Sequence, residues 1–306
     1  MRQTSSNARG TVERMIYLSG CPRSGTTLVG NLIGSARGAE YDYEPATLHS
    51  LLSVLPDLRA AGQLDTWRLL FETYCHEELL LGNLAGRNFN LNPHDDSWVG
   101  HYRPLEEIAA RQAKGWRKYE LDALAAERTL VVKTPGVLPE LAQVARLYPT
   151  LRLGVLLREP NDVLGSLLSR KWFDLSPETA EIYLWPYREV RGAKVPVCIP
   201  PELDRWWLDA REVERAARYL LVQMTAALGV ERAVVIDYDA LVRAPEAEVE
   251  PLLHAFGLVP TPKTAEVAAG IAPRPSRYPD LVGQLPEPMQ REIAETTDAL
   301  RSRKPD

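Results

Sequence analysis

Residues 15 to 28 read MIYLSGCPRSGTTL and contain the pattern that decides the fold. A short apolar run over 15–19 precedes a loop in which Gly20 and Gly25 have the spacing of the phosphate-binding sequence G-x-x-x-x-G-K-[ST]. The residues that follow, TTLVGNLIGS, have the apolar spacing of a helix. This order of strand, glycine loop and helix predicts that backbone N–H groups surround an anion at the N-terminus of the helix.

The loop lacks the lysine of nucleotide kinases. Thr26 stands at the lysine position, Thr27 keeps the hydroxyl position, and the cation of the loop is Arg23. Phosphoryl transfer needs a lysine and Mg²⁺ because a terminal phosphate is densely charged. A transferring sulfuryl group carries a single negative charge, so we expect Arg23 to hold such a group without a metal.

With these residues the chain resembles the sulfotransferases that use 3′-phosphoadenosine 5′-phosphosulfate (PAPS), whose 5′-phosphosulfate loop commonly reads PRSGTT or PKSGTT. The resemblance implies that PAPS is the co-substrate and that no metal takes part. It also implies that the loop binds the 5′ side of PAPS, through Cys21, Pro22, Arg23, Ser24, Gly25, Thr26 and Thr27.

Composition sets limits on partners and location. The 306 residues include 36 basic and 41 acidic side chains, a net charge of −5, so nothing favours nucleic acid or an anionic membrane as a partner. The N-terminal residues contain no apolar stretch of the length found in a signal peptide, and no apolar run in the chain approaches the roughly 18 residues of a membrane span. We therefore expect a cytoplasmic protein. The three cysteines and five histidines show neither disulfide nor zinc-ligand spacing.

Further strands of the buried, parallel type are TLVVK, which ends at Lys133, LRLGVLL, which ends before Arg158, and AVVID. Helical patterns alternate with these strands. We predict an α/β fold of the P-loop NTPase type, a three-layer sandwich in which helices cover both faces of a mostly parallel central sheet, with helical insertions. Several prolines between 260 and 288 indicate a mostly irregular segment.

The length suits one sulfotransferase domain over residues 1–306. Residues 1–13 are expected to form a flexible N-terminus. Two stretches, 61–128 and 172–205, match no pattern of the family and are rich in aromatic residues. We interpret them as insertions that form the acceptor pocket.

Arg158, Ser166 and Arg170 are spaced to bind a phosphate. Ligands of open α/β sheets bind beyond the carboxyl ends of the strands, where Arg158 lies. Ser166 follows eight residues later, and Arg170 is four beyond it on the same predicted helix face. The segment LLREPNDVLGSLLSRK resembles the 3′-phosphate motif of the family, and its further Arg matches the tyrosylprotein sulfotransferase branch. Glu159 stands where family members usually have Asp.

The resemblance implies that Lys133, in VVKTP, points at the sulfuryl group. Cytosolic members follow this lysine with a general-base His, whose position Pro135 occupies here. Glu44, in YDYEP, resembles the catalytic Glu of the tyrosylprotein and Golgi-type branches in type and approximate spacing. A carboxylate at this place can accept the proton of a substrate hydroxyl. Asp42 and His49 are alternatives for the base, and Glu44 could instead cap the next helix.

Tyr238, in VVIDYDALVRAPE, resembles the Tyr of the family's Y-E-x-L segment, which reaches the nucleotide. Arg274 and Arg277 lie where family members close a basic segment over the 3′-phosphate. Asp237 follows an apolar strand, as a Walker-B aspartate does. A Mg²⁺-dependent small-molecule kinase, with Thr27 and Asp237 as metal partners, is therefore an alternative, and so is a nucleotide-binding module without turnover.

The function that we predict is metal-free, in-line transfer of a sulfuryl group from PAPS to a hydroxyl group. Glu44 would act as the general base, while Arg23 and Lys133 stabilise the charge that develops. A small molecule, a sugar and a peptide all fit as acceptor, and the sequence does not distinguish between them. It gives no oligomeric state either.

Overall fold

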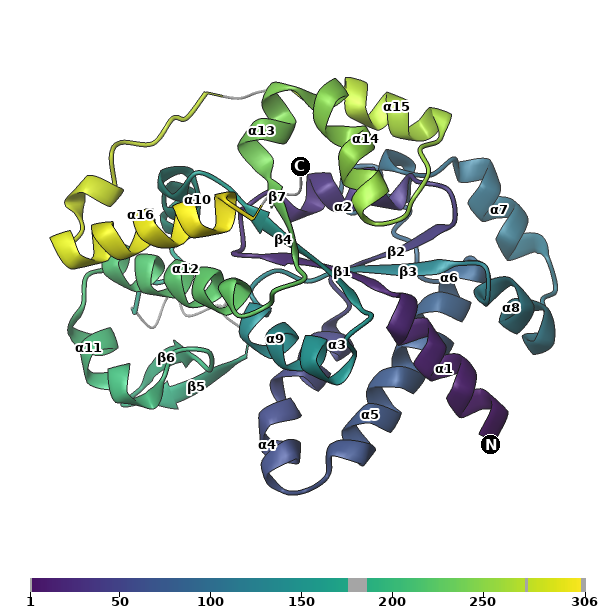
Figure 1. Cartoon of the computed structure of the whole chain (residues 1–306), viewed down its shortest axis with the longest axis horizontal. Helices are drawn as coiled ribbons and strands as arrows, with labels where there is room; N and C mark the ends of the chain where they lie inside the picture. Colours follow the sequence, from purple (N-terminus) through teal and green to yellow (C-terminus); the bar gives the residue numbers. More distant parts are fainter. Residues whose placement is uncertain (1, 176–185, 273–274, 304–306) are drawn as a thin grey trace.

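The computed structural model describes residues 2–175, 186–272 and 275–303. At its centre lies a five-stranded sheet in the order β2, β3, β1, β4, β7, in which all neighbours run parallel (Figure 1). The strands are β1 (Ile16–Gly20), β2 (Ala39–Tyr43), β3 (Thr129–Lys133), β4 (Arg152–Leu157) and β7 (Val234–Asp237). The predicted parallel sheet is confirmed.

Helices connect the strands and lie on both faces of the sheet (Figure 1). Up to β4 they are α1 (Arg2–Arg14), α2 (Thr26–Gly34), α3 (Ala46–Ser53), α4 (Leu55–Ala60), α5 (Leu64–Thr73), the π-helix η1 (Tyr74–Leu80), α6 (Leu81–Leu84), the 3-10 helix η2 (Val99–His101), α7 (Leu105–Ala113), α8 (Lys118–Ala125) and α9 (Leu138–Leu147). After β4 they are α10 (Pro160–Leu168), η3 (Pro201–Leu203), α11 (Asp204–Asp209), α12 (Glu212–Leu228), α13 (Tyr238–Arg243), α14 (Pro245–Ala255), α15 (Pro262–Ala269), η4 (Val282–Gln284) and α16 (Glu287–Arg301).

The central strands divide their side chains between two apolar cores, because successive residues of a strand point to opposite faces. Tyr17 of β1 belongs to the core that includes residues of α1, α5, α9 and α12. Its neighbours Ile16 and Leu18 belong to the core that includes residues of α2 and α14. Strands buried on both faces read as continuous apolar runs, so these could be recognised in the sequence. The result is the predicted three-layer sandwich.

The N-terminal residues differ from the flexible segment expected for 1–13. They form α1, which packs against α5 and η1. Ala8 and Val12, one helical turn apart, are both buried. Polar residues dominate the stretch, but these two small apolar side chains on one face suffice to dock the helix.

The region between 260 and 288 is less irregular than its prolines indicate, because α15 lies within it. Pro262 stands in the first turn of this helix, where its missing N–H would have no helical partner in any case. The hydroxyl of Thr261 caps the helix by accepting a hydrogen bond from the N–H of Thr264. Beyond this region, α16 buries Met289, Ile293 and Leu300 and packs against α12.

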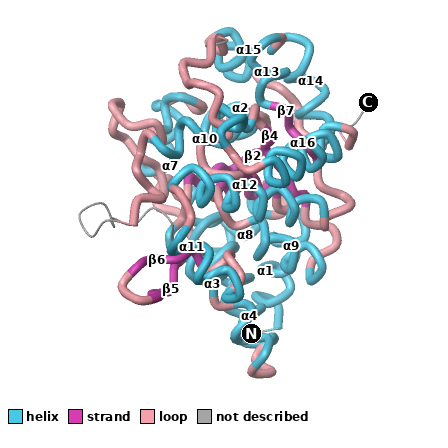
Figure 2. The backbone as a smooth tube through the Cα atoms, turned by 90° about the vertical axis from the view of Figure 1, so that its left-hand side faces the viewer, coloured by secondary structure: helices cyan, strands magenta, loops and turns pink. Residues whose placement is uncertain are grey.

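The described part of the 172–205 stretch contains a hairpin of β5 (Tyr187–Val190) and β6 (Ala193–Pro196). Figure 2 shows this hairpin beside α11, away from the central sheet. Within the described ranges, none of the helices combines the length and the apolar character that a membrane crossing requires.

Candidate active site at the carboxyl edge of the sheet

The polar residues singled out in the sequence meet at one edge of the sheet, where all five parallel strands end. The loop of residues 21–27 follows β1 at the centre. On one side of it, Lys133 ends β3 and Glu44 follows β2. On the other side, Arg158 follows β4 and Tyr238 follows β7. The order of the strands therefore places Glu44 and Tyr238 at opposite ends of the site, with the loop between them.

The loop after β1 has an unusual backbone. Arg23 and Gly25 have positive φ angles of 75° and 95°, and α2 begins directly after them at Thr26. Left-handed backbone positions in such a loop turn successive N–H groups to one side, toward an anion. Gly25 is also close to the ring of Tyr238, because a Cβ atom at this position would lie 2.2 Å from a ring carbon. Both constraints require glycine here.

Arg23, Ser166 and Arg158 are brought together in the structure. Arg23 Nε donates a hydrogen bond to Ser166 Oγ at 2.9 Å. Arg158 Nη1 donates to the carbonyl oxygen of Arg23 at 3.2 Å, and Nη2 pairs with Asp162 at 3.2 Å. The Arg158 guanidinium lies 4.9 Å from the centre of the Tyr238 ring. Two guanidinium groups and one hydroxyl thus surround the space beside the loop.

Arg170 departs from the prediction that it shares a helix face with Ser166. The helix α10 ends at Leu168, and Arg170 follows in an exposed turn. The next residue, Lys171, has a positive φ of 54°, so the chain has left the helical path. No glycine or proline marks this end in the sequence. A role of Arg170 in binding stays a prediction.

The segment around Arg277 lies against α10. Asn161 Nδ2 donates to the carbonyl oxygen of Pro279 at 2.8 Å, and its Oδ1 accepts the N–H of Leu281 at 2.7 Å. The ring of Tyr278 packs on Gly165, where a Cβ atom would lie 2.1 Å from it. Arg277, which donates to the hydroxyl of Tyr278 at 3.4 Å, is therefore held near Ser166. No local sequence pattern marks Asn161 or Tyr278, and Arg274 lies outside the described residues.

Lys133 and Glu44 form an ion pair on the other side of the loop. The Lys133 side chain is 1% exposed, and its Nζ donates to Glu44 Oε1 and, at 3.2 Å, to Thr27 Oγ1. The same ammonium lies 3.7 Å from the centre of the Tyr43 ring. Burial lowers the pKa of Lys133, and the carboxylate of Glu44 opposes this effect. Lys133 thus connects β3 with both the loop and the end of β2.

Glu44 occupies a backbone conformation that is rare for residues other than glycine, with a φ of 48°. Its N–H donates to the carbonyl oxygen of Lys133 at 2.8 Å, which continues the pairing of β2 with β3 by one residue. The next helix, α3, has Pro45 at its N-cap and no side-chain cap. Glu44 therefore does not cap this helix. With 39% of its side chain exposed, its carboxylate is accessible to a substrate.

Asp42 and His49, the alternative bases, lie in different surroundings. Asp42 is 5% exposed, and burial raises its pKa to about 8 despite a hydrogen bond from Asn83. At neutral pH this carboxyl group is mostly protonated and therefore a poor base. Burial also lowers the pKa of His49, against the effect of the nearby Glu44 charge. Glu44 differs from both in its surroundings, because its side chain is half-exposed and its carboxylate is bonded to the ammonium of Lys133.

Two further loop and strand-end residues have structural roles. Cys21 is 3% exposed and belongs to an apolar core, and burial raises the pKa of its thiol. Its side chain thus points away from the anion. Asp237 caps α13 by accepting two backbone N–H groups, and its other oxygen lies 3.4 Å from Arg301 Nε. Because both oxygens already have partners, Asp237 is poorly placed to hold Mg²⁺ with Thr27, as the kinase alternative requires.

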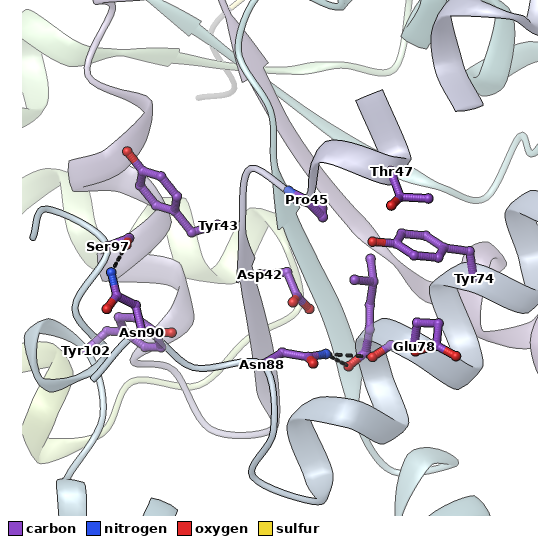
Figure 3. A pocket seen from close by; sticks show the side chains of 11 residues that line it. Asp42, Tyr43, Pro45, Thr47, Tyr74, Glu78, Asn88, Asn90, Ser97 and Tyr102 are labelled. Atoms are coloured by element: carbon purple, nitrogen blue, oxygen red, sulfur yellow. Dashed lines mark hydrogen bonds between the residues drawn. The ribbon is translucent and has the colours of Figure 1, made fainter. Parts of the chain in front are cut away.

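A cavity of about 450 Å³ lies beside the end of β2 (Figure 3). Tyr43 and Pro45, the two neighbours of Glu44 in the chain, line it. Most of the other lining residues come from the predicted insertion 61–128, in which η1, the chain between α6 and η2, and the residue that follows η2 contribute Tyr74, Glu78, Leu79, Asn88, Asn90, Ser97 and Tyr102. The described part of the 172–205 stretch supplies no lining residue to this cavity. Tyr74 and Tyr102 belong to the aromatic residues of the 61–128 stretch that the sequence predicts to line an acceptor pocket, whereas no sequence pattern marks the polar lining residues Asn88, Asn90 and Ser97.

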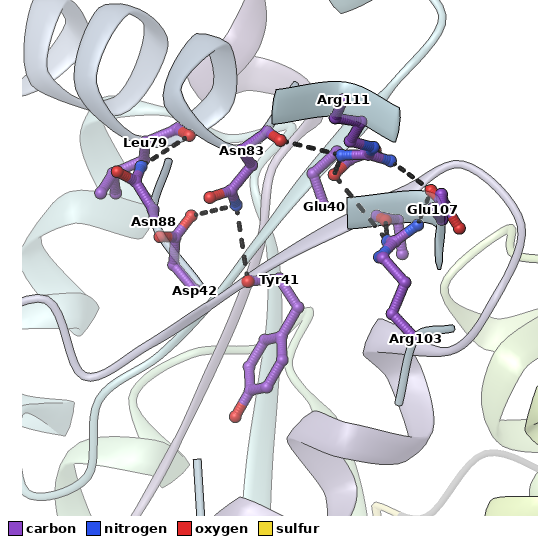
Figure 4. A network of polar contacts seen from close by, with 10 residues as sticks. Glu40, Tyr41, Asp42, Leu79, Asn83, Asn88, Arg103, Glu107 and Arg111 are labelled. Carbon is purple, nitrogen blue, oxygen red and sulfur yellow. Dashed lines mark hydrogen bonds and ion pairs between the residues drawn. The ribbon is translucent and has the colours of Figure 1, made fainter. Parts of the chain in front are cut away.

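Behind the cavity, a buried ionic network fixes β2 (Figure 4). Glu40 is 0% exposed and accepts two hydrogen bonds from Arg111, at 2.8 and 3.0 Å. Arg111 also donates to Glu107 and to the carbonyl oxygen of Asn83. The side chain of Asn83 in turn donates to Asp42 at 2.7 Å. The network thereby holds Asp42 in place at the cavity wall.

A family model described as "Sulfotransferase family" matches residues 16–262. No curated protein matches the sequence. The sulfotransferase domain of the olefin synthase of Synechococcus PCC 7002 is a similar solved structure, with 15% identity, 94% of each chain covered and a TM-score of 0.47. Sulfotransferase STF9 from Mycobacterium avium has 15% identity, with 97% of this chain and 83% of that chain covered and a TM-score of 0.45. A sulfotransferase from Alicyclobacillus acidocaldarius has 16% identity, with 94% of this chain and 95% of that chain covered and a TM-score of 0.44.

Replacing Gly25 with alanine should lower the affinity of the loop for pyrophosphate about tenfold or more. A left-handed residue with a Cβ atom costs roughly 1–2 kcal/mol, and the ring of Tyr238 has to move as well. Calorimetric titration with pyrophosphate measures the change. Gly115→Ala is the matched control, because no atom lies within 4 Å of a Cβ at that position. Wild-type affinity in Gly25→Ala would contradict the proposed role of the loop backbone.

Arg111→Ala should lower the free energy of unfolding by about 3 kcal/mol, because it leaves the buried Glu40 carboxylate with only the more distant Arg103, at 3.8 Å. Urea denaturation measures this quantity. Arg291→Ala removes an exposed pair with Glu287 and should hardly change the midpoint. If both variants unfold at the same urea concentration, the network does not stabilise β2.

Proposed function

The chain belongs to the sulfotransferase family, and from this premise we propose that it transfers a sulfuryl group from PAPS to the hydroxyl group of an acceptor. The observation that carries the proposal is the position of the cations. Arg23 lies in the loop, Arg158 donates to the carbonyl oxygen of Arg23, and Lys133 donates to the hydroxyl of Thr27, so the three cations lie around the loop. Thr26 stands at the position where a kinase has its lysine.

The residues present suit the two phosphate groups of such a donor. The positive-φ loop offers its N–H groups to the 5′ side, and only glycine fits at Gly25. On the 3′ side, Arg158 Nε is buried without a hydrogen-bond partner among the described residues. A buried guanidinium N–H without an acceptor is costly, and a phosphate oxygen would supply one. Ser166 is bonded to Arg23, whose carbonyl oxygen accepts from Arg158. Arg277 lies beside Tyr278, whose ring packs on the same helix at Gly165, so we expect both side chains to contribute to the 3′ side.

In the proposed reaction PAPS supplies the sulfuryl group. The loop amides and Arg23 hold the 5′ side in line with the acceptor. Glu44 takes the proton of the acceptor hydroxyl as the new O–S bond forms. The S–O bond to the 5′-phosphate breaks, and its electron pair stays on the leaving bisphosphate. Lys133 and Arg23 stabilise the charge that develops there.

The ion pair of Lys133 and Glu44 couples these steps. Once Glu44 is protonated, it no longer neutralises the buried ammonium of Lys133. The ammonium then interacts more strongly with the negative charge on the leaving group, in a site that little water enters. Proton transfer and leaving-group stabilisation thus support each other.

Binding of 3′-phosphoadenosine 5′-phosphate should be at least tenfold tighter than binding of AMP, because a charge-assisted hydrogen bond contributes roughly 1.5–3 kcal/mol. Arg158→Ala should remove most of this preference. Arg232→Ala, at the opposite end of β7 and exposed, should keep it. Calorimetry decides, and equal affinities for the two nucleotides in the wild type would overturn the assignment of Arg158 and Ser166.

Glu44→Gln keeps the shape of the side chain and its ability to accept a hydrogen bond from Lys133, but it removes the basic carboxylate. Donor binding should stay near the wild-type level, and turnover should fall by roughly 10² to 10⁴-fold. Labelled sulfate transferred to an acceptor mixture, with products identified by mass, measures turnover. His49→Ala is the comparison, and a larger loss in that variant would show that the base is misassigned. Phosphate transfer from ATP that stops in a chelator, without any sulfated product, would instead support the kinase alternative.

A further inference from the structure

The cavity beside Glu44 is acidic. Its lining includes the carboxyl groups of Asp42 and Glu78, and none of the described residues that line it is Lys, Arg or His. Asp95 and Asp96 lie near its rim, where their charges help to raise the pKa of Tyr43, although burial is the larger cause. The charged side chains beside the loop, Arg23 and Arg158, are in contrast cationic.

Asp42 is the buried group of this cavity. Its Oδ2 atom accepts a hydrogen bond from Asn83 at 2.7 Å, and no described residue donates to its Oδ1 atom. Figure 3 shows the carboxyl group in the middle of the cavity wall, between the side chains of Tyr102 and Tyr74. Because Oδ1 is the oxygen of this mostly buried carboxyl group that lacks a donor, a ligand in the cavity can supply the missing hydrogen bond.

The neighbouring cations are engaged elsewhere. Arg103 and Arg111 pair with Glu40 and Glu107, on the far side of Asn83 (Figure 4). Lys133 pairs with Glu44. Asp42 therefore has no ion-pair partner of its own among the described residues. A cation that enters the cavity would meet a carboxyl group ready to pair with it.

We propose that the acceptor is a hydroxyl compound with a cationic amino group, whose ammonium binds Asp42 while its hydroxyl group lies at Glu44. This inference rests on the proposed transferase function for the role of Glu44. Asp42 and Glu44 are two residues apart in the chain, so their Cα atoms lie at most about 7 Å apart, and a ring or a short carbon chain can connect the two groups of the acceptor. The rings of Tyr74 and Tyr102 offer further contacts to a cation, and Glu78 adds negative charge at the rim.

Binding of an ammonium should release a proton. Burial raises the pKa of Asp42 to about 8, and the charge of Glu40 contributes, whereas the hydrogen bond from Asn83 lowers it. Tyr74, Cys75 and Tyr102 also face Asp42 and are uncharged at neutral pH. A bound cation favours the ionised carboxylate, so at neutral pH up to one proton leaves as the amine enters. A neutral acceptor would release none.

The test compares three phenols that differ in one group. Tyramine carries an ammonium, 4-propylphenol has a methyl group in its place, and 3-(4-hydroxyphenyl)propanoate has a carboxylate. Calorimetry with the full chain and 3′-phosphoadenosine 5′-phosphate should give an affinity for tyramine about tenfold or more above that of the other two. Titrations in buffers with different ionisation heats should show proton release with tyramine alone.

Asp42→Asn should abolish both the preference for tyramine and the proton release. Asp65→Asn, an exposed carboxyl on α5, is the matched control and should keep both. Each variant's affinity for the bisphosphate nucleotide reports whether it is folded, and Glu78→Gln provides a second variant, with a smaller expected loss, if Asp42→Asn does not fold.

The inference is overturned if 4-propylphenol or the propanoate binds as tightly as tyramine, if Asp42→Asn keeps the preference, or if tyramine does not bind. Failure of the proposed function looks different. It would appear as absence of bisphosphate binding or of sulfated product, while the titrations of the phenols without nucleotide still report the charge preference of the cavity.

Discussion

The buried ammonium of Lys133 is the interaction on which the site depends. A charge removed from water at the end of β3 needs nearby partners, because an isolated buried cation is strongly unfavourable. Glu44 provides the opposite charge, Thr27 a hydroxyl oxygen and Tyr43 a ring face. These partners come from β2 and from the first turn of α2, so one cation fixes the positions of the anion loop and the proposed base relative to each other.

The same cation separates a region of guanidinium groups from a region of carboxyl groups. On the loop side, Arg23 and Arg158 face the space proposed for the donor. On the β2 side, Asp42 and Glu78 face the cavity proposed for the acceptor. The net charge of the chain, −5, does not reveal this arrangement, because each region is assembled locally from strand ends and loops. An anionic donor and a cationic acceptor would each be drawn to its own side.

The parts of the structure that could be predicted are those specified by local sequence. The central strands are apolar runs, and the loop and the Arg158 to Ser166 spacing lie within short motifs. A helix end that no glycine or proline marks is harder to predict from the sequence. For this reason the sequence places Arg170 on the helix, although α10 ends at Leu168. Contacts between segments that are far apart in the chain leave no pattern in the local sequence. The bonds of Asn161 to residues about 120 positions away and the cavity around Asp42 belong to this class.

The cavity lies beside an edge strand, and this has an evolutionary consequence. β2 pairs with β3 on one side only, whereas the strands that carry the anion loop and Arg158 have neighbours on both sides. Substitutions in the chain between α6 and η2, which lines the cavity, disturb few contacts of the central sheet. The fold can thus keep its donor chemistry unchanged while the acceptor side diversifies, one lining residue at a time.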